Sequence, residues 1–195
     1  MDGPLFQENF FETREKFIRE NWSPDGDYQK MVIDEFLKIK EVEGGFEVYF
    51  WFEDDLFCQI NYWFLVNDLA DRTLDLFRIF PTNEVSGFGN SDSDDLKKCF
   101  QQPVKLSAAE KEKISTLWKS YQLSNNFIVT DLETVRNLEE LAEANANRFN
   151  GELLSQLKNL KTKTENFTEF FRAFQKQFPI YGFGDLQVKT LWDNL

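Results

Sequence analysis

The chain has 195 residues and a formal net charge of −12, with no histidine and two cysteines. This length allows one large domain or two small ones. Without histidine, the chain can form neither a Ser-His-Asp triad nor a histidine-ligated zinc or haem site. Acid–base chemistry would fall to carboxylates, lysine, tyrosine or cysteine, and a metal would be a hard cation such as Mg²⁺ held by oxygens. Most hydrolase mechanisms are thereby excluded.

The charge is unevenly distributed along the chain. Residues 1–95 hold 22 Asp and Glu against 8 Lys and Arg, whereas residues 96–195 hold 12 against 14. We therefore expect an acidic α/β part over 1–95 and a helical part over 96–195. Because the acidic part would repel polyanions, nucleic-acid binding is a weak alternative that only the C-terminal helices could support.

Two further expectations come from composition. The chain shows no secretory signal, no apolar run of roughly 20 residues that could span a membrane and no disulfide framework, so we expect a cytoplasmic protein without membrane contact. The 22 phenylalanines predict a core rich in this residue, because aromatic side chains bury large areas.

The first half of the chain alternates helical and extended patterns. Amphipathic spacing predicts a helix over about 5–21 and a second helix that carries apolar residues from Met31 to Ile39 and ends at Glu43-Gly44-Gly45. The short aromatic or β-branched runs 46–52 and 74–80 predict two buried strands, and the apolar stretch between them predicts a helix near 56–70. A strand–helix–strand unit of this length is almost always parallel.

The second half is predicted to be helical after a loop over 86–95. The Ser107-Ala108-Ala109-Glu110 run is typical of a capping box, and Ile114, Leu117, Trp118 and Tyr121 follow it at core spacing. Further helices are expected over about 131–147, 151–160 and 166–177, with a short one after Gly184. The fold class is therefore α/β, with a small parallel sheet and flanking helices, followed by an all-helical C-terminal half.

Two parallel strands make a poor sheet by themselves. Either a third strand has no clear sequence signal, or N-terminal strands are missing, or a second copy completes the sheet. An open sheet edge and face also predict that the chain buries a patch against a copy of itself or another protein.

Several motifs resemble those of one family. Residues 51–59, Trp-Phe-Glu-Asp-Asp-Leu-Phe-Cys-Gln, are similar to the W-F-E-x-D-L-x-x-Q signature of a bacterial domain-of-unknown-function family catalogued as number eighteen thirty-five. Further similarity covers Asp2-Gly3-Pro4, the helix from Phe11, Gly87-Phe88-Gly89, the Leu117–Tyr121 run and the segment from Phe178-Pro179. The resemblance spans essentially the whole chain and implies a Rossmann-like α/β fold followed by helices, but no activity. Relatives carry a further strand–helix–strand segment before the D/E-G-P motif, which implies that this chain is N-terminally shortened.

Acidic and glycine-rich segments follow the two predicted strands. Glu53, Asp54, Asp55 and Gln59 lie where the first strand ends and the next helix begins, and Gly87, Gly89 and Asn90 follow the second strand. Because parallel neighbours end at one edge of a sheet, we expect Glu53 and Asp55 to converge on the 87–90 loop in the main polar cleft.

Glu53 and Asp55 are the candidate metal ligands, for a divalent cation such as Mg²⁺. The same carboxylates suit ribose hydroxyls, whereas direct phosphate contact is disfavoured unless a metal intervenes. Helix capping alone is the alternative explanation of the acids. Cys58, without a histidine partner, is expected to be a structural buried thiol.

These observations favour a regulatory module that binds a small ligand or a protein without turnover. The alternative is a metal-dependent enzyme acting on a nucleotide or phosphorylated metabolite through Glu53 and Asp55. Neither composition nor motif spacing identifies the ligand.

Overall fold

The structure, a computed structural model, describes residues 9–22, 26–42, 44–81 and 87–195. The strands are β1 (Glu47–Trp51), β2 (Asp75–Ile79) and β3 (Val104–Lys105). The α-helices are α1 (Phe10–Trp22), α2 (Asp34–Lys40), α3 (Leu56–Leu69), α4 (Ser93–Phe100), α5 (Ala108–Ser124), α6 (Leu138–Phe149), α7 (Glu152–Lys161), α8 (Phe167–Gln177) and α9 (Asp185–Asp193). Short helical turns are η1 (Gln29–Ile33), η2 (Phe88–Asn90) and η3 (Pro179–Tyr181).

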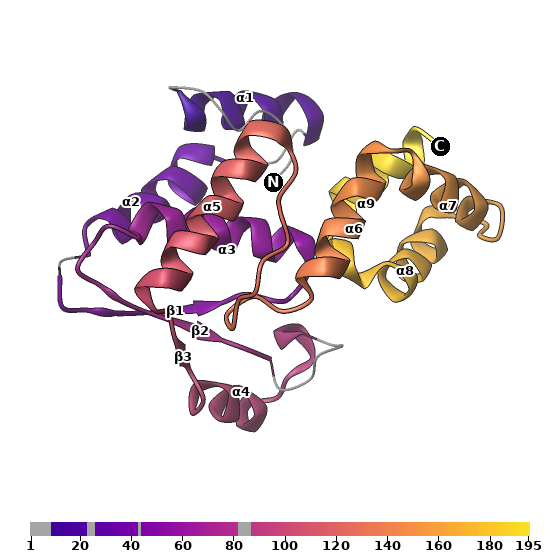
Figure 1. Cartoon of the computed structure of the whole chain (residues 1–195). Helices are drawn as coiled ribbons and strands as arrows, with labels where there is room; N and C mark the ends of the chain where they lie inside the picture. Colours follow the sequence, from indigo (N-terminus) through magenta and orange to yellow (C-terminus); the bar gives the residue numbers. More distant parts are fainter. Residues whose placement is uncertain (1–8, 23–25, 43, 82–86) are drawn as a thin grey trace.

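The sheet has three strands in the order β1-β2-β3 (Figure 1). β1 and β2 are parallel, with Glu47 opposite Asp75 and Trp51 opposite Ile79, and α3 connects them. The predicted strand–helix–strand unit is thus confirmed. β3 adds an antiparallel neighbour to β2, and residues beyond it are helical or irregular. The third strand is two residues long and follows a proline, so no alternating pattern marked it in the sequence.

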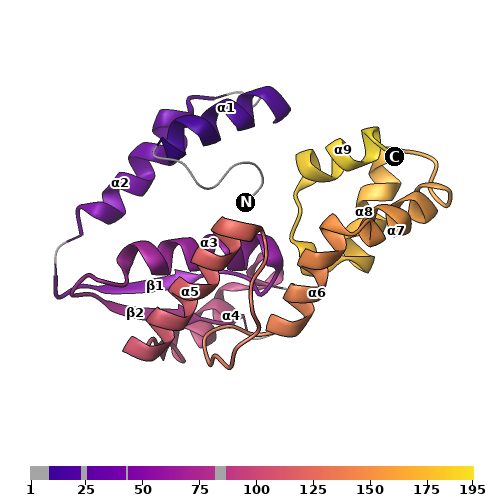
Figure 2. The ribbon, with the colours of Figure 1, turned by 45° about the horizontal axis from the view of Figure 1, so that its top comes forward.

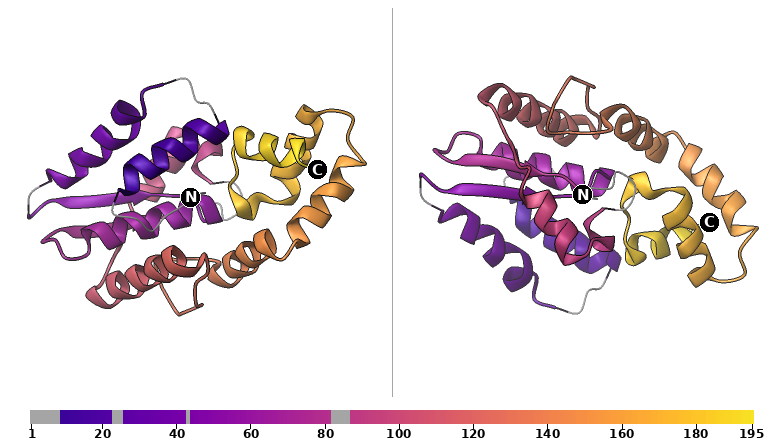
Figure 3. Two further views of the ribbon diagram at one scale, coloured as in Figure 1. Left: turned by 90° about the horizontal axis from the view of Figure 1, so that it is seen from above. Right: turned by 90° about the horizontal axis from the view of Figure 1, so that it is seen from below.

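Helices cover the two faces of the sheet unequally. α3 and α5 pack together over one face, and α4 lies on the other (Figures 1 and 3). α1 and α2 form an outer layer beyond α3, which Figure 2 shows clearly. Phe10 and Phe36 connect this layer to α3, because their rings stack on Phe64 at 5.5 and 5.4 Å. None of the helices in the described ranges is long and apolar enough to cross a membrane.

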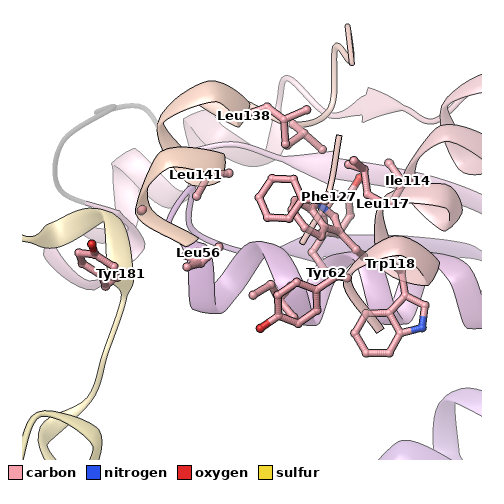
Figure 4. Close-up of a cluster of buried hydrophobic side chains, with 14 of the residues drawn as sticks. Leu56, Tyr62, Ile114, Leu117, Trp118, Phe127, Leu138, Leu141 and Tyr181 are labelled. Carbon is pink, nitrogen blue, oxygen red and sulfur yellow. The ribbon is translucent and has the colours of Figure 1, made fainter. Parts of the chain in front are cut away.

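The hydrophobic core runs from the sheet into the C-terminal helices. Figure 4 shows Ile114, Leu117 and Trp118 of α5 in the same cluster as Tyr62 of α3, with Tyr181 in the C-terminal part. Leucine dominates the buried positions, and the expectation of a phenylalanine-rich core is wrong. Most of the phenylalanines that contact the core are only partly buried, for example Phe52, Phe171 and Phe178. They pack against a core in which leucines are buried together with aromatic residues such as Trp63 and Tyr121.

The strand β1 is less buried than the prediction of a buried strand implies. Its residues alternate, with Phe50 4% exposed and Trp51 39% exposed. On the open face Tyr49 stacks on Phe77 at 4.9 Å, and Phe100 of α4 covers this pair only partly. The expected assembly with a copy or another protein stays a prediction, for which this aromatic face is the natural surface.

Two predicted boundaries shift for local reasons. The helix expected from about 131 begins at Leu138, because Asn137 has a φ of 55° and the carboxylate of Glu110 accepts hydrogen bonds from the Glu133 and Thr134 amides. α4 begins inside the predicted 86–95 loop, because Asp92 caps it by accepting from the amides of Asp94 and Asp95.

Other predicted boundaries hold closely. The Ser107 capping box is present, and the helices expected near 56–70, 151–160, 166–177 and after Gly184 are observed. Residues 5–8 of the first predicted helix, the Asp2-Gly3-Pro4 motif and Ser86 lie outside the described residues.

The contact between α3 and α5 should dominate stability. Ile114 is fully buried in the core and Ile128 is 81% exposed. We expect Ile114→Ala to lower the free energy of unfolding by about 2–5 kcal/mol, and Ile128→Ala to change it by less than about 0.5 kcal/mol. Urea denaturation followed by circular dichroism measures both. Equal effects of the two substitutions would contradict this packing.

Candidate functional site

The carboxyl ends of β1 and β2 face the C-terminal helices (Figure 1). A cleft of about 600 Å³ lies at this junction, where open α/β sheets bind their ligands. We call it the edge cleft. Its floor carries the carboxylates of Glu53, Asp54 and Asp55, and its wall consists of Phe174, Phe178, Ile180 and Phe183.

Glu53 connects the turn after β1 to the loop after β2. Its Oε1 accepts hydrogen bonds from the amides of Phe88 at 2.7 Å and Gly89 at 3.2 Å. Gly87, with a φ of +61°, allows this approach, because a Cβ there would overlap the Glu53 carboxylate. The predicted convergence of Glu53 on the glycine loop is therefore observed.

Asp55 caps α3 and contacts the other side of the cleft. Its Oδ1 accepts from the Cys58 amide at 2.9 Å, as an N-cap residue does. Gly182, with a φ of +63°, lies against this carboxylate so closely that a Cβ would overlap it. Burial raises the pKa of Asp55, and the neighbouring charge of Glu53 adds to the increase. Asp55 thus contacts the C-terminal half at Gly182. In the described part of the chain no hydrogen bond joins Asp55 to the 87–90 loop, so of the two predicted carboxylates only Glu53 is hydrogen-bonded to that loop.

Asp54 lines the cleft and is held in an ion pair. Arg78, which is fully buried, donates from Nη2 to Asp54 at 3.1 Å, and Arg136 lies 3.8 Å from the other oxygen. Burial raises the pKa of Asp54 despite both guanidinium groups, and it lowers the pKa of Arg78. The contact between Arg78 and Asp54 is therefore a buried, hydrogen-bonded ion pair.

Arg78 also ties the strand ends together. Its Nη1 donates to the carbonyl oxygens of Phe50 at 3.3 Å and Ile79 at 2.8 Å. The guanidinium lies 5.0 Å from the ring centre of Tyr62 and 4.9 Å from that of Phe80. One buried cation therefore connects β1, β2, α3 and the turn Glu53-Asp54-Asp55, which we call the acidic turn.

The remaining predicted residues take structural positions. Gln59 is fully buried and donates to the Glu53 carbonyl at 2.7 Å, so it shapes the turn from beneath and does not line the cleft. Gly89 supplies an amide to Glu53, and Asn90 ends the η2 turn; its side chain lies outside the description. Cys58 is half-buried and lines the cleft, and burial raises the pKa of its thiol to about 12.

Sequence reasoning missed the cations and the aromatic wall. Arg78 had one available signal, since a charge inside an apolar strand must be paired when the strand is buried. Arg136 and the wall residues 174–183 had none, because only the packing of η3 against α3, α6 and α8 brings that segment to the sheet edge.

Metal binding is not favoured by the geometry. In the described ranges, no group of three or more Cys, Asp and Glu side chains is placed to hold a metal ion. Asp54 is engaged by two arginines, which leaves Glu53 and Asp55 as the floor carboxylates that form no ion pair within the described residues. Their predicted role as metal ligands stays a prediction.

Comparison of the chain with protein-family models, with curated proteins and with solved structures found no match. The family resemblance therefore stays a prediction that rests on its motifs. Function has to be argued from the site.

The two glycines of the loop should respond differently to substitution. Gly87 needs a positive φ and adjoins Glu53, whereas a Cβ at Gly89 would meet nothing within 4 Å. We expect Gly87→Ala to destabilise the protein by more than about 1 kcal/mol and Gly89→Ala by less than about 0.5 kcal/mol. Thermal unfolding of both variants checks this, and similar effects would mean that the Glu53 contact is not formed.

Asp55 should make stability depend on pH in a defined direction. Its folded-state pKa is raised, so the folded state loses stability relative to the unfolded state as pH rises above the unfolded value of about 3.8. Asp55→Asn keeps an oxygen that can accept from Cys58 but does not titrate. We therefore expect the stability of Asp55→Asn relative to the wild type to increase as pH rises above about 4.

The measurement is urea denaturation of both proteins across this range. A relative stability that stays constant, or that falls as pH rises, would show that Asp55 is not desolvated.

Proposed function

We propose that the chain is a small-ligand-binding module whose ligand docks in the edge cleft without being chemically changed. The observation that carries the proposal is the cleft itself, with a carboxylate floor on the sheet edge and an aromatic wall from the C-terminal half. Ligand sites commonly combine mostly apolar walls with a few fixed polar groups, and their volumes are about 300–1,000 Å³.

The floor is already ordered by contacts within the chain. Glu53 is fixed by two amides, Asp55 by the start of α3, and Asp54 by Arg78. A ligand would therefore meet polar groups whose orientation is set before binding, which lowers the entropy lost on association. The same contacts explain why these acids also serve the fold.

Binding is better supported than turnover. The Cys58 thiol lines the cleft, and with a pKa of about 12 it is protonated at neutral pH. A metal-dependent reaction would have to rely on Glu53 and Asp55 alone, since Asp54 is paired with arginine.

A cytoplasmic location belongs to this proposal. Cys58 and Cys99 are both free thiols, which suits a reducing compartment. The ligand would then be a small cytoplasmic molecule.

The proposal is tested by filling the cleft. Gln175 lines it from α8 and is exposed, so Gln175→Trp should place an indole ring in the cleft without removing a core contact. Lys176→Trp, one residue further along the same helix, adds the same ring outside the lining residues and serves as the matched control.

Saturation-transfer NMR with a mixed library of neutral, anionic and cationic fragments provides the readout. We expect fragments that bind the wild type to lose most of their signal with Gln175→Trp and to keep it with Lys176→Trp. The proposal would be contradicted if no fragment bound the wild type, or if every fragment that binds it still bound Gln175→Trp.

A further inference from the structure

The described residues that line the edge cleft carry negative charge and no positive charge, which favours one class of ligand over the others. Three carboxylates line it, and its lining within the described residues contains no lysine or arginine. We propose that its ligand is an organic cation, an ammonium group carried by an apolar body. This inference rests on the proposed function and specifies its ligand.

Only one of the three floor charges is neutralised by the protein. Arg78 pairs with Asp54 from beneath, where it is fully buried, and Arg136 lies near the same carboxylate. Glu53 contacts neutral amides, and so does Asp55. The charged group that acts on Asp55 is Glu53, a like charge. Two carboxylates thus share the floor without a cation among the described lining residues, and a bound cation would be attracted to both.

The opposite wall is suited to the rest of such a ligand. Phe174 and Phe183 stack with their ring centres 6.1 Å apart and an interplanar angle of 6°, and Phe178 lies beside Phe174 at 5.5 Å. Phe174 is buried, and the guanidinium of Arg148 already lies 5.4 Å from the ring centre of Phe183. The wall therefore offers its partly buried rings as an apolar surface for the body of a ligand. A molecule that spans floor and wall would therefore place its charge on the carboxylates and its apolar part on the rings.

Other ligand classes fit less well. For a divalent metal ion, the described residues contain no group of three or more Cys, Asp and Glu side chains placed to hold it, and the phenylalanine rings of the wall supply no oxygen ligand. A phosphate or carboxylate ligand would need the amides of Phe88 and Gly89, which already donate to Glu53. The anion-binding position of the loop is thus occupied by the chain's own carboxylate.

Both acids can be neutralised without loss of their structural contacts. Glu53→Gln retains an oxygen for the Phe88 and Gly89 amides, and Asp55→Asn retains one for the Cys58 amide. The double variant therefore isolates charge from structure. Glu35→Gln with Glu41→Gln removes the same two charges from exposed positions at α2 and its C-terminal end and serves as the control.

The experiment compares three probes of one shape by saturation-transfer NMR and titration at low salt: phenethylammonium, phenethyl alcohol and phenylpropionate. We expect phenethylammonium to bind the wild type at least about tenfold more tightly than the alcohol, and phenylpropionate to bind most weakly. The double variant should lose this preference while still binding the alcohol, and the α2 control should keep it. Gln175→Trp should abolish binding of all three probes.

The two proposals fail in different ways. If the alcohol or phenylpropionate binds as tightly as the ammonium compound and Gln175→Trp blocks it, the cation inference is overturned and the ligand-binding function stands. If phenethylammonium binds but the double variant keeps its full preference, the cation inference is equally overturned. If neither these probes nor the fragment library binds in the cleft, both proposals are wrong.

Discussion

The guanidinium of Arg78 is the interaction on which the sheet edge depends. It is fully buried, lies between the rings of Tyr62 and Phe80, and donates to Phe50, Ile79 and Asp54. A buried charge is tolerated only when it is paired and hydrogen-bonded, so Asp54 must occupy the turn after β1. With Asp54 held inward, the residues on either side, Glu53 and Asp55, are fixed at the floor of the cleft. The ion pair of Asp54 with Arg78 stabilises the acidic turn, and it leaves the carboxylates of Glu53 and Asp55 on the cleft side, where a ligand can contact them.

The two sides of the cleft approach each other at two glycines, where no side chain keeps the carboxylates of Glu53 and Asp55 away from the backbone. Glu53 contacts the loop at Gly87, and Asp55 contacts the C-terminal half at Gly182, both at positive φ. These contacts bring a sheet edge and a helical wall together over a short distance without filling the space between them. The arrangement separates polar groups on one side from aromatic groups on the other, which is the basis of the proposed preference for a cation with an apolar body.

The sequence predicted the parts whose signals are local. The runs 46–52 and 74–80, the apolar span between them and the Ser107 capping box all have short-range patterns, and each is observed close to its predicted bounds. The meeting of Glu53 with Gly87 could be predicted because the ends of parallel strands share an edge. The contact of Asp55 with Gly182 could not, because it depends on how η3 packs against α3. The prediction of a phenylalanine-rich core was wrong for a related reason. The number of phenylalanines indicates many aromatic contacts, but it does not determine whether a given ring lies at the centre of the core or at its margin.

The most direct test of this account is amide hydrogen exchange in Arg78→Met. If Arg78 fixes the acidic turn, the variant should be destabilised by about 3–5 kcal/mol, because Asp54 loses its buried hydrogen-bonded partner and keeps only the longer contact with Arg136. The amides of Phe88, Gly89 and Cys58, which donate to Glu53 and Asp55, should lose protection more than the amides in the middle of α5. Adding Asp54→Asn should restore part of both losses. Wild-type stability and unchanged protection of these three amides in Arg78→Met would contradict the central claim that one buried cation sets the geometry of the cleft.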